Sequence, residues 1–387
     1  MAAAYKIASP RWKRDDTMSA PMNRELPVDK VLVALVVGLT LFGTVMVYSA
    51  SAVLAQKNYG TQYYFLLRQG AWAAIGLVAM AVAIRIDYRH YKRPVVLIPL
   101  LGVTSLLLFA VLFFPAVNGT HRWIRYGSYV SIQPSEVSKL ALIAFLAFFL
   151  ENRLGEITSF KRTFLPAVVL AGLTIILVAA EPDLGTALSL GAVFTVMTFH
   201  AGVPFRYLAS MAIPAAPALV YMLIVPWRFK RLMVFLDPWK DQTGTGFQVV
   251  QSLIAIGSGG LSGAGFAQGK QKLFYLPAPH TDFIFAVIGE ELGFMGAATV
   301  VLLFGLLAWR GFRAAKFAPD LFGQLLAIGV TVMITVQALF NVSVALSLVP
   351  AKGIPLPFIS SGGSSLAISL FATGVLLNVS KHGKRQD

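Results

Sequence analysis

Long apolar runs alternate with short charged segments along most of the chain. Several runs approach the roughly 20 residues that a helix needs to cross the hydrocarbon core of a bilayer. Dividing the sequence at its charged residues predicts an all-α polytopic membrane protein with about ten transmembrane helices. The predicted spans cover residues 31–53, 69–84, 94–114, 135–150, 164–180, 184–200, 207–226, 282–309, 321–349 and 364–380.

The same pattern divides the chain into a membrane domain and two tails. A charged tail of residues 1–30 precedes the ten-helix domain of residues 31–380, and a basic tail of residues 381–387 follows it. The longest connection, residues 227–281, joins helices seven and eight. An even number of spans predicts that both tails lie on the same side of the membrane.

The distribution of Lys and Arg predicts which side that is. With the N-terminus in the cytoplasm, the inside segments hold 20 Lys and Arg residues, against 6 in the short outside segments. Because short cytoplasmic loops carry an excess of these residues, both termini are predicted to be cytoplasmic. The 227–281 connection is then a large extracytoplasmic loop.

Composition excludes several classes of protein. Hydrophobic residues make up 57% of the chain and charged residues 13%, whereas soluble domains carry about 25% charge. The chain has no cysteine, which excludes disulfides, Cys-ligated zinc and Fe–S clusters. The net charge of +15 arises from cations at the ends of spans, which favours contact with membrane lipids and predicts no nucleic-acid partner.

Two charges must lie within the fourth helix. Only 11 uncharged residues separate Lys139 from Glu151, too few to cross a membrane, so this helix begins before Lys139 and contains Glu136. Ionisable groups at membrane depth are costly and therefore candidates for a function. Their three-residue spacing places both on one helical face, which is also compatible with simple mutual neutralisation.

Most of the unusual polar residues fall at the outer ends of the predicted helices. They are Arg122, Trp123, Glu136, Lys139, Glu181, Asp183, Asp282, Lys352 and the Ser/Gly segment 360–365. A transporter more often places its site near the bilayer midplane. The one-sided cluster therefore indicates chemistry or binding at the outer leaflet.

A reaction at the outer leaflet has no ATP and needs an activated substrate, such as a lipid-linked sugar diphosphate. Arg122 and Lys139 are candidate cations for the diphosphate. Glu136 or Asp183 would hold Mg²⁺ or Mn²⁺ through oxygen ligands. Glycosyl transfer also requires a base to accept the proton of the acceptor hydroxyl, and Asp282 is the candidate.

Asp282 has an alternative interpretation as the N-cap of helix eight, together with Thr281. A helix N-terminus also lowers the pKa of a carboxylate, so a base at this position needs burial or neighbouring acids to offset that effect. At 100° per residue, Glu290 is turned about 80° from Asp282 and Glu291 about 180°. Glu290 is therefore predicted to share the cavity of Asp282.

Four stretches of sequence together resemble one family, the SEDS proteins, also known as the FtsW/RodA/SpoVE group of bacterial cell-wall polymerases. The stretches are His280-Thr281-Asp282-Phe283-Ile284-Phe285-Ala286-Val287-Ile288-Gly289-Glu290-Glu291-Leu292-Gly293; Arg122-Trp123-Ile124 followed by Gln133-Pro134-Ser135-Glu136 and Lys139; Glu181-Pro182-Asp183-Leu184-Gly185-Thr186; and Gly353-Ile354-Pro355-Leu356-Pro357-Phe358 with Ser361-Gly362-Gly363-Ser364-Ser365.

The resemblance implies a peptidoglycan glycosyltransferase that polymerises lipid II at the outer face of the bacterial cytoplasmic membrane. It assigns Asp282 to the essential acid of the family. The candidate substrate-binding residues are Arg122, Gln133, Ser135, Glu136, Lys139, Asp183, His280 and Glu290.

The Gly289-Glu290-Glu291 continuation and the charged tail before Val31 resemble the division members more than the elongation members of this family. That implies a role in septal wall synthesis, at the division septum, with an elongation-type polymerase as the alternative. The resemblance implies a cognate class B penicillin-binding protein, a transpeptidase, as partner. It further suggests contact with the divisome proteins FtsQ, FtsL and FtsB.

Two other functions compete with a polymerase. A lipid II flippase should continue its polar path to the inner leaflet, but helix nine carries no charge between Leu321 and Ala351. A scaffold that only recruits the transpeptidase would not need Glu136 and Lys139 inside the membrane. Both comparisons favour the enzyme.

Overall fold

The computed structural model describes residues 26–115, 120–126, 130–211, 213, 226–242, 244, 246–273 and 275–383. The α-helices are α1 (Lys30–Tyr59), α2 (Tyr64–Arg85), α3 (Pro94–Val111), α4 (Pro134–Asn152), α5 (Leu165–Ala180), α6 (Leu184–His200), α7 (Phe205–Ser210), α9 (Pro226–Leu236), α10 (Phe247–Ser258), α11 (Ile284–Lys316), α12 (Leu321–Ala345) and α13 (Ser364–Lys381). Shorter elements are η1 (Tyr88–Lys92), η2 (Leu154–Glu156), η3 (Phe160–Phe164), η4 (Pro238–Asp241), β1 (Ile124–Tyr126) and β2 (Val130–Ile132).

The predicted all-α polytopic membrane fold is confirmed. Seven helices in the described part of the chain are long and apolar enough to cross a membrane. α4 also has the length of a span, although it contains charged residues, and α6 is a shorter apolar helix. Helices suit a membrane because their backbone groups are satisfied without water. The predicted seventh span, 207–226, lies mostly outside the described residues.

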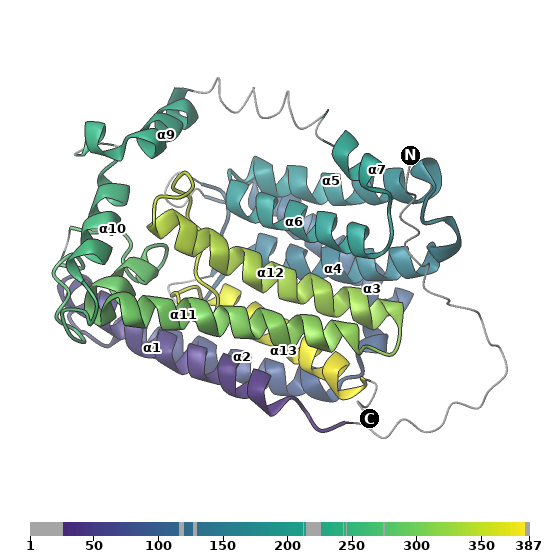
Figure 1. Cartoon of the computed structure of the whole chain (residues 1–387), viewed down its shortest axis with the longest axis horizontal. Coiled ribbons are helices and arrows are strands. Elements are labelled where there is room, and N and C mark those ends of the chain that lie inside the picture. Colours follow the sequence, from purple (N-terminus) through teal and green to yellow (C-terminus); the bar gives the residue numbers. More distant parts are fainter. Residues whose placement is uncertain are drawn as a thin grey trace, which may run out of the picture.

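The long helices run side by side, with α12 packed against α11, α6, α4 and α13 (Figure 1). α12 is apolar on every face for most of its length, the composition expected of a helix surrounded by protein. Small residues allow close packing elsewhere: an added Cβ at Gly374 of α13 would meet the backbone of Met80 in α2. This bundle supplies the rigid walls of the site.

The 227–281 segment contains more regular structure than a simple loop, because η4, α10 and all of α9 except its first residue lie within it. α10 packs against α11, at the same end of the bundle as the connection from α12 to α13 (Figure 1). α11 starts at Ile284, two residues later than the predicted span, and is kinked at Gly293, where φ is 65°. The kink permits a close backbone contact with residues 261–263.

Candidate functional site

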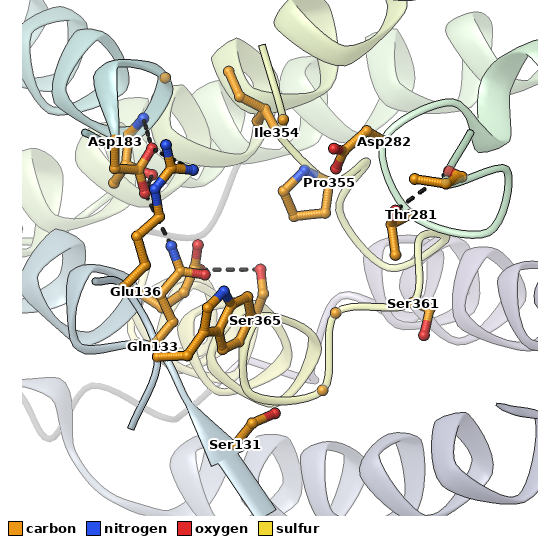
Figure 2. Close-up of a pocket in the computed structure, with 18 of the residues that line it drawn as sticks. Ser131, Gln133, Glu136, Asp183, Thr281, Asp282, Ile354, Pro355, Ser361 and Ser365 are labelled. Carbon is orange, nitrogen blue, oxygen red and sulfur yellow. Dashed lines mark hydrogen bonds and ion pairs between the residues drawn. The ribbon is translucent and has the colours of Figure 1, made fainter. Parts of the chain in front are cut away.

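A cavity of about 670 Å³ lies where the ends of several helices meet. Seven of the predicted site residues line it: Arg122, Gln133, Glu136, Lys139, Asp183, His280 and Asp282. Figure 2 shows Asp183 and Asp282 on different sides of this pocket, with Ile354 and Pro355 between them. The structure thus brings together residues that are far apart in the sequence.

Asp282 lies in the turn that precedes α11 and is half-buried. The N-cap of α11 is Phe283, without a side-chain capping bond, so the alternative of Asp282 as a helix cap is wrong. Burial raises the pKa of the Asp282 carboxyl to about 6; Arg122 opposes the rise and Asp183 adds to it. The offset that a general base requires at this position is therefore present.

Backbone contacts hold the turn that carries Asp282. The Ser360 hydroxyl donates to the carbonyl of Thr281 (2.6 Å), and the Ser361 amide donates to the carbonyl of His280 (2.9 Å). His280 also packs against the ring of Phe65, with 4.4 Å between the centroids, and burial lowers its pKa to about 4. The His280 side chain is consequently neutral at pH 7.

Asp183 organises a second wall of the cavity. As the N-cap of α6, its carboxylate accepts from the amide and the hydroxyl of Thr186 (3.1 and 2.9 Å). It also accepts from the side chains of Gln133 (2.9 Å) and Ser135 (3.5 Å). Ser135 is buried and contributes to the site through Asp183 rather than by lining the cavity.

Arg122 is held at the connection between α5 and α6. Its guanidinium donates to the carbonyls of Glu181 (3.1 Å) and Pro182, and lies 3.9 Å from the Asp183 carboxylate. Burial raises the pKa of Glu181 to about 8, an effect to which Asp183 adds, so this neighbouring acid is mostly neutral at pH 7. Glu181 therefore adds little negative charge beside Arg122, which pairs with Asp183 and is partly exposed at the rim of the cavity.

Glu136 and Lys139 form the ion pair that their spacing allowed. Lys139 Nζ lies 2.8 Å from Glu136 Oε2, and both side chains are 2% exposed. Each has a further partner: the Ser365 hydroxyl donates to Glu136 (3.0 Å), and Lys139 donates to the Gln337 side-chain oxygen (2.7 Å). The pair is thus part of a network that reaches α12 and α13.

Glu290 corrects one prediction, because it does not line the cavity. Its Oε1 instead accepts from the backbone amides of Lys270 (2.6 Å) and Gln271 (3.1 Å). The predicted angle between Asp282 and Glu290 holds only if Asp282 belongs to the helix, whereas α11 begins only at Ile284. The next residue, Glu291, is buried in an ion pair with Lys272, 2.5 Å apart, so both acids fix the segment before Asp282.

Four further residues of the cavity were not predicted from the sequence. Arg68 and Trp72 of α2, Arg125 of β1 and Gln337 of α12 all line it. Arg68 and Arg125 could have been recognised from the sequence, because they lie on the predicted outer side, where the positive-inside rule predicts few cations. The amide Gln337 gave no such signal within its apolar helix.

The described residues contain no group of three His, Asp or Glu side chains that could hold a metal ion. Glu136 and Asp183 line the cavity, but each already accepts hydrogen bonds from the protein. These residues do not fit a preformed metal site. Mg²⁺ commonly uses only one or two carboxylates together with substrate phosphates.

Comparison with known proteins agrees with this architecture. The family model described as "Cell cycle protein", FTSW_RODA_SPOVE, matches residues 29–385. A probable peptidoglycan glycosyltransferase FtsW from Geobacter metallireducens is 45% identical, over 92% of this chain and 95% of that protein. Stage V sporulation protein E from Bacillus subtilis is 43% identical, over 92% of this chain and 98% of that protein.

Solved structures share the fold. One, from a peptidoglycan synthase complex that coordinates polymerization and crosslinking, matches with a TM-score of 0.76 and 32% identity, covering 92% of this chain and 98% of that one. RodA from Thermus thermophilus matches with a TM-score of 0.68 and 29% identity, covering 93% of this chain and 99% of that one. The fold and site define a polytopic membrane protein with a polar cavity at one end of its bundle. The chain belongs to the FtsW/RodA/SpoVE family.

Proposed function

We propose that this protein is a peptidoglycan glycosyltransferase that polymerises lipid II into glycan strands at the outer face of the cytoplasmic membrane, for septal wall synthesis in cell division. The observation that supports it best is a half-buried carboxyl with a raised pKa, Asp282, in a cavity that also holds Arg68, Arg122 and Arg125. A base and several cations are what transfer from a sugar diphosphate requires. The name of the FtsW relative describes the same activity.

In the proposed reaction the hydroxyl oxygen of the acceptor sugar attacks the anomeric carbon of the donor. The bond between that carbon and the diphosphate oxygen breaks, and the acceptor proton passes to the Asp282 carboxylate. Arg122, which is partly exposed at the cavity rim, faces the negative charge that grows on the departing lipid diphosphate. Lys139 acts from the buried side of the cavity, where Glu136 orients its ammonium group.

A divalent cation, Mg²⁺ or Mn²⁺, remains part of the proposal. Because Glu136 and Asp183 do not form a preformed site, they would at most add ligands to an ion that arrives with the diphosphate. Chelation of divalent cations during the assay, followed by separate addition of each metal, tests this requirement.

The proposal extends to partners and location. We expect a cognate class B penicillin-binding protein as partner, since one structurally similar protein belongs to a synthase complex that coordinates polymerization and crosslinking. Contact with FtsQ, FtsL and FtsB, a septal location and cytoplasmic termini follow from the division-type motifs and the Lys/Arg distribution. Co-purification with each candidate partner would test the first two expectations.

The deciding experiment incubates the purified protein, alone and with its transpeptidase partner, with lipid II and a divalent cation, and measures glycan length. We expect polymer from the wild type, and a loss of about 10²–10⁴-fold in Asp282→Asn, the range for removal of a general base. A normally inserted Asp282→Asn protein that polymerises at the wild-type rate would remove Asp282 from the mechanism. Lipid II translocation without polymer would instead identify a flippase.

A further inference from the structure

Two amide side chains lie one turn apart on α12, and the first of them, Gln337, lines the cavity. Gln337 and Asn341 are both buried. Asn341 Nδ2 donates two hydrogen bonds, to the carbonyl of Asp282 (2.8 Å) and to the carbonyl of Ile354 (2.7 Å). One side chain thus joins the turn that carries Asp282 to the connection between α12 and α13.

Gln337 makes the corresponding contacts one turn away. Its Oε1 accepts from Lys139 Nζ (2.7 Å), and its Nε2 donates to the carbonyl of Pro355 (3.0 Å). Both amides therefore hold adjacent carbonyls of the same connection, those of Ile354 and Pro355. Through it they link Lys139 to the turn of Asp282.

The segment of Gly353, Ile354 and Pro355, in which the two amides hold the carbonyls, lies directly against the Asp282 carboxylate. A Cβ added at Gly353 would lie 2.7 Å from Asp282 Oδ2. On its other side the segment packs against the start of α6, where an added Cβ at Gly185 would overlap the Ile354 side chain. A small displacement of Ile354 would therefore move the backbone that bounds the carboxylate.

We infer that Gln337 and Asn341 act as an amide clamp that sets the position of Asp282 relative to Lys139. Both are positioning residues, and the inference rests on the proposed glycosyl transfer. Asn341 does not line the cavity and so acts through the Asp282 and Ile354 carbonyls. Reaction rates depend steeply on such placement, because a misplacement of about 1 Å can cost on the order of 10²-fold.

The test compares Asn341→Ala, Asn341→Asp and Gln337→Met with wild type in the lipid II polymerisation assay. Asn341→Asp keeps the shape of the side chain but replaces the NH₂ group that serves both carbonyls with a carboxyl that has at most one O–H to donate. We expect kcat to fall by about 10- to 100-fold in the Asn341 variants, while KM for lipid II changes by less than about threefold, because binding groups are untouched. Gln337→Met should reduce kcat in the same direction.

Two control variants separate positioning from general packing. The Ser252 hydroxyl of α10 donates to the carbonyl of Ala345 (2.8 Å), a buried bond to the same helix that does not reach the cavity, so Ser252→Ala should lower thermal stability but not kcat. The Thr335 hydroxyl of α12 has no hydrogen-bond partner among the described residues, so Thr335→Val should change neither. Equal losses of kcat in Ser252→Ala and Asn341→Ala would overturn the inferred positioning role, because the Ser252 bond does not reach the cavity.

A second readout does not need activity. The chain has no cysteine, so Ala351→Cys provides a single thiol next to the clamped segment. We expect a water-soluble maleimide to label it several-fold faster when Asn341→Ala is added, and at an unchanged rate with Thr335→Val. Unchanged labelling in the Asn341→Ala background would overturn the inference even if the wild type forms no polymer. Absence of polymer from the wild type would by itself overturn only the proposed function.

Discussion

The Asp282 carboxyl differs from an ordinary aspartate because burial penalises its charged form. With a pKa of about 6, it is ionised at pH 7 but becomes protonated as the pH falls. A protonated base cannot accept a proton, so kcat/KM should decrease by about tenfold per unit below pH 6. A pH–rate profile of lipid II polymerisation measures this decrease of kcat/KM on the acid side. A flat profile from about pH 5 to pH 7 would exclude Asp282 as the base in the free enzyme.

Gly353 is a residue at which one added methyl group should strongly reduce activity. Its added Cβ would lie 2.7 Å from Asp282 Oδ2, so Gly353→Ala must displace the carboxylate. We expect polymerisation to fall on the order of 10²-fold, as for other small misplacements, with little change in the melting temperature, because Gly353 is exposed. Gly257→Ala, which places its methyl in open space, is the matched control and should keep full activity. Normal polymerisation by Gly353→Ala would show that the carboxylate tolerates displacement.

At the scale of elements, α4 carries a buried ion pair that can be architectural or functional. The charge swap Glu136→Lys with Lys139→Glu keeps the attraction and retains polar neighbours in Ser365 and Gln337. It moves the cation by about one helical turn relative to the substrate. We therefore expect the swapped protein to recover stability lost in the single variants, which can reach about 3–5 kcal/mol, but not polymerisation.

Protein levels and melting temperatures must accompany the activity of the swapped protein, because the single variants leave an unpaired buried charge. Glu136→Gln with Lys139→Met serves as a neutral comparison without the pair. Substantial polymer from the swapped variant would assign the pair to architecture and remove Lys139 from diphosphate binding.

At the scale of the whole molecule, the site lies at the end of the bundle that also holds α10 and the connection from α12 to α13 (Figure 1). We expect this end to face outward, as the Lys/Arg distribution predicts. Two single-cysteine variants, Lys240→Cys and Asp387→Cys, test this orientation in cells in which the cytoplasmic membrane is intact and the layers outside it have been made permeable. A membrane-impermeant maleimide should label position 240 and not position 387, and the reverse labelling would invert the topology.

The sequence by itself determined the membrane fold and much of the site's composition. Bilayer thickness sets the length of each span, and backbone groups in lipid must bond within helices, so apolar runs translate into helices with little ambiguity. The same length requirement placed Glu136 and Lys139 inside a membrane helix, because the uncharged residues that follow Lys139 are too few to cross the membrane alone. The polar residues at the outer helix ends included Asp183 and Asp282, and the family motifs added Gln133; the structure places all three in one cavity.

Only the tertiary structure decided how these residues are held. The sequence placed Glu290 in the cavity because helical phase was counted from Asp282, and a two-residue difference in the start of α11 was enough to make that wrong. It gave no indication that Asn341 joins the carbonyls of Asp282 and Ile354. Periodicity in the sequence indicates which face of a helix a residue occupies. The hydrogen bonds of Asn341, however, join segments that are distant in the sequence. The pKa of Asp282 likewise depends on the burial that arises when these segments pack together.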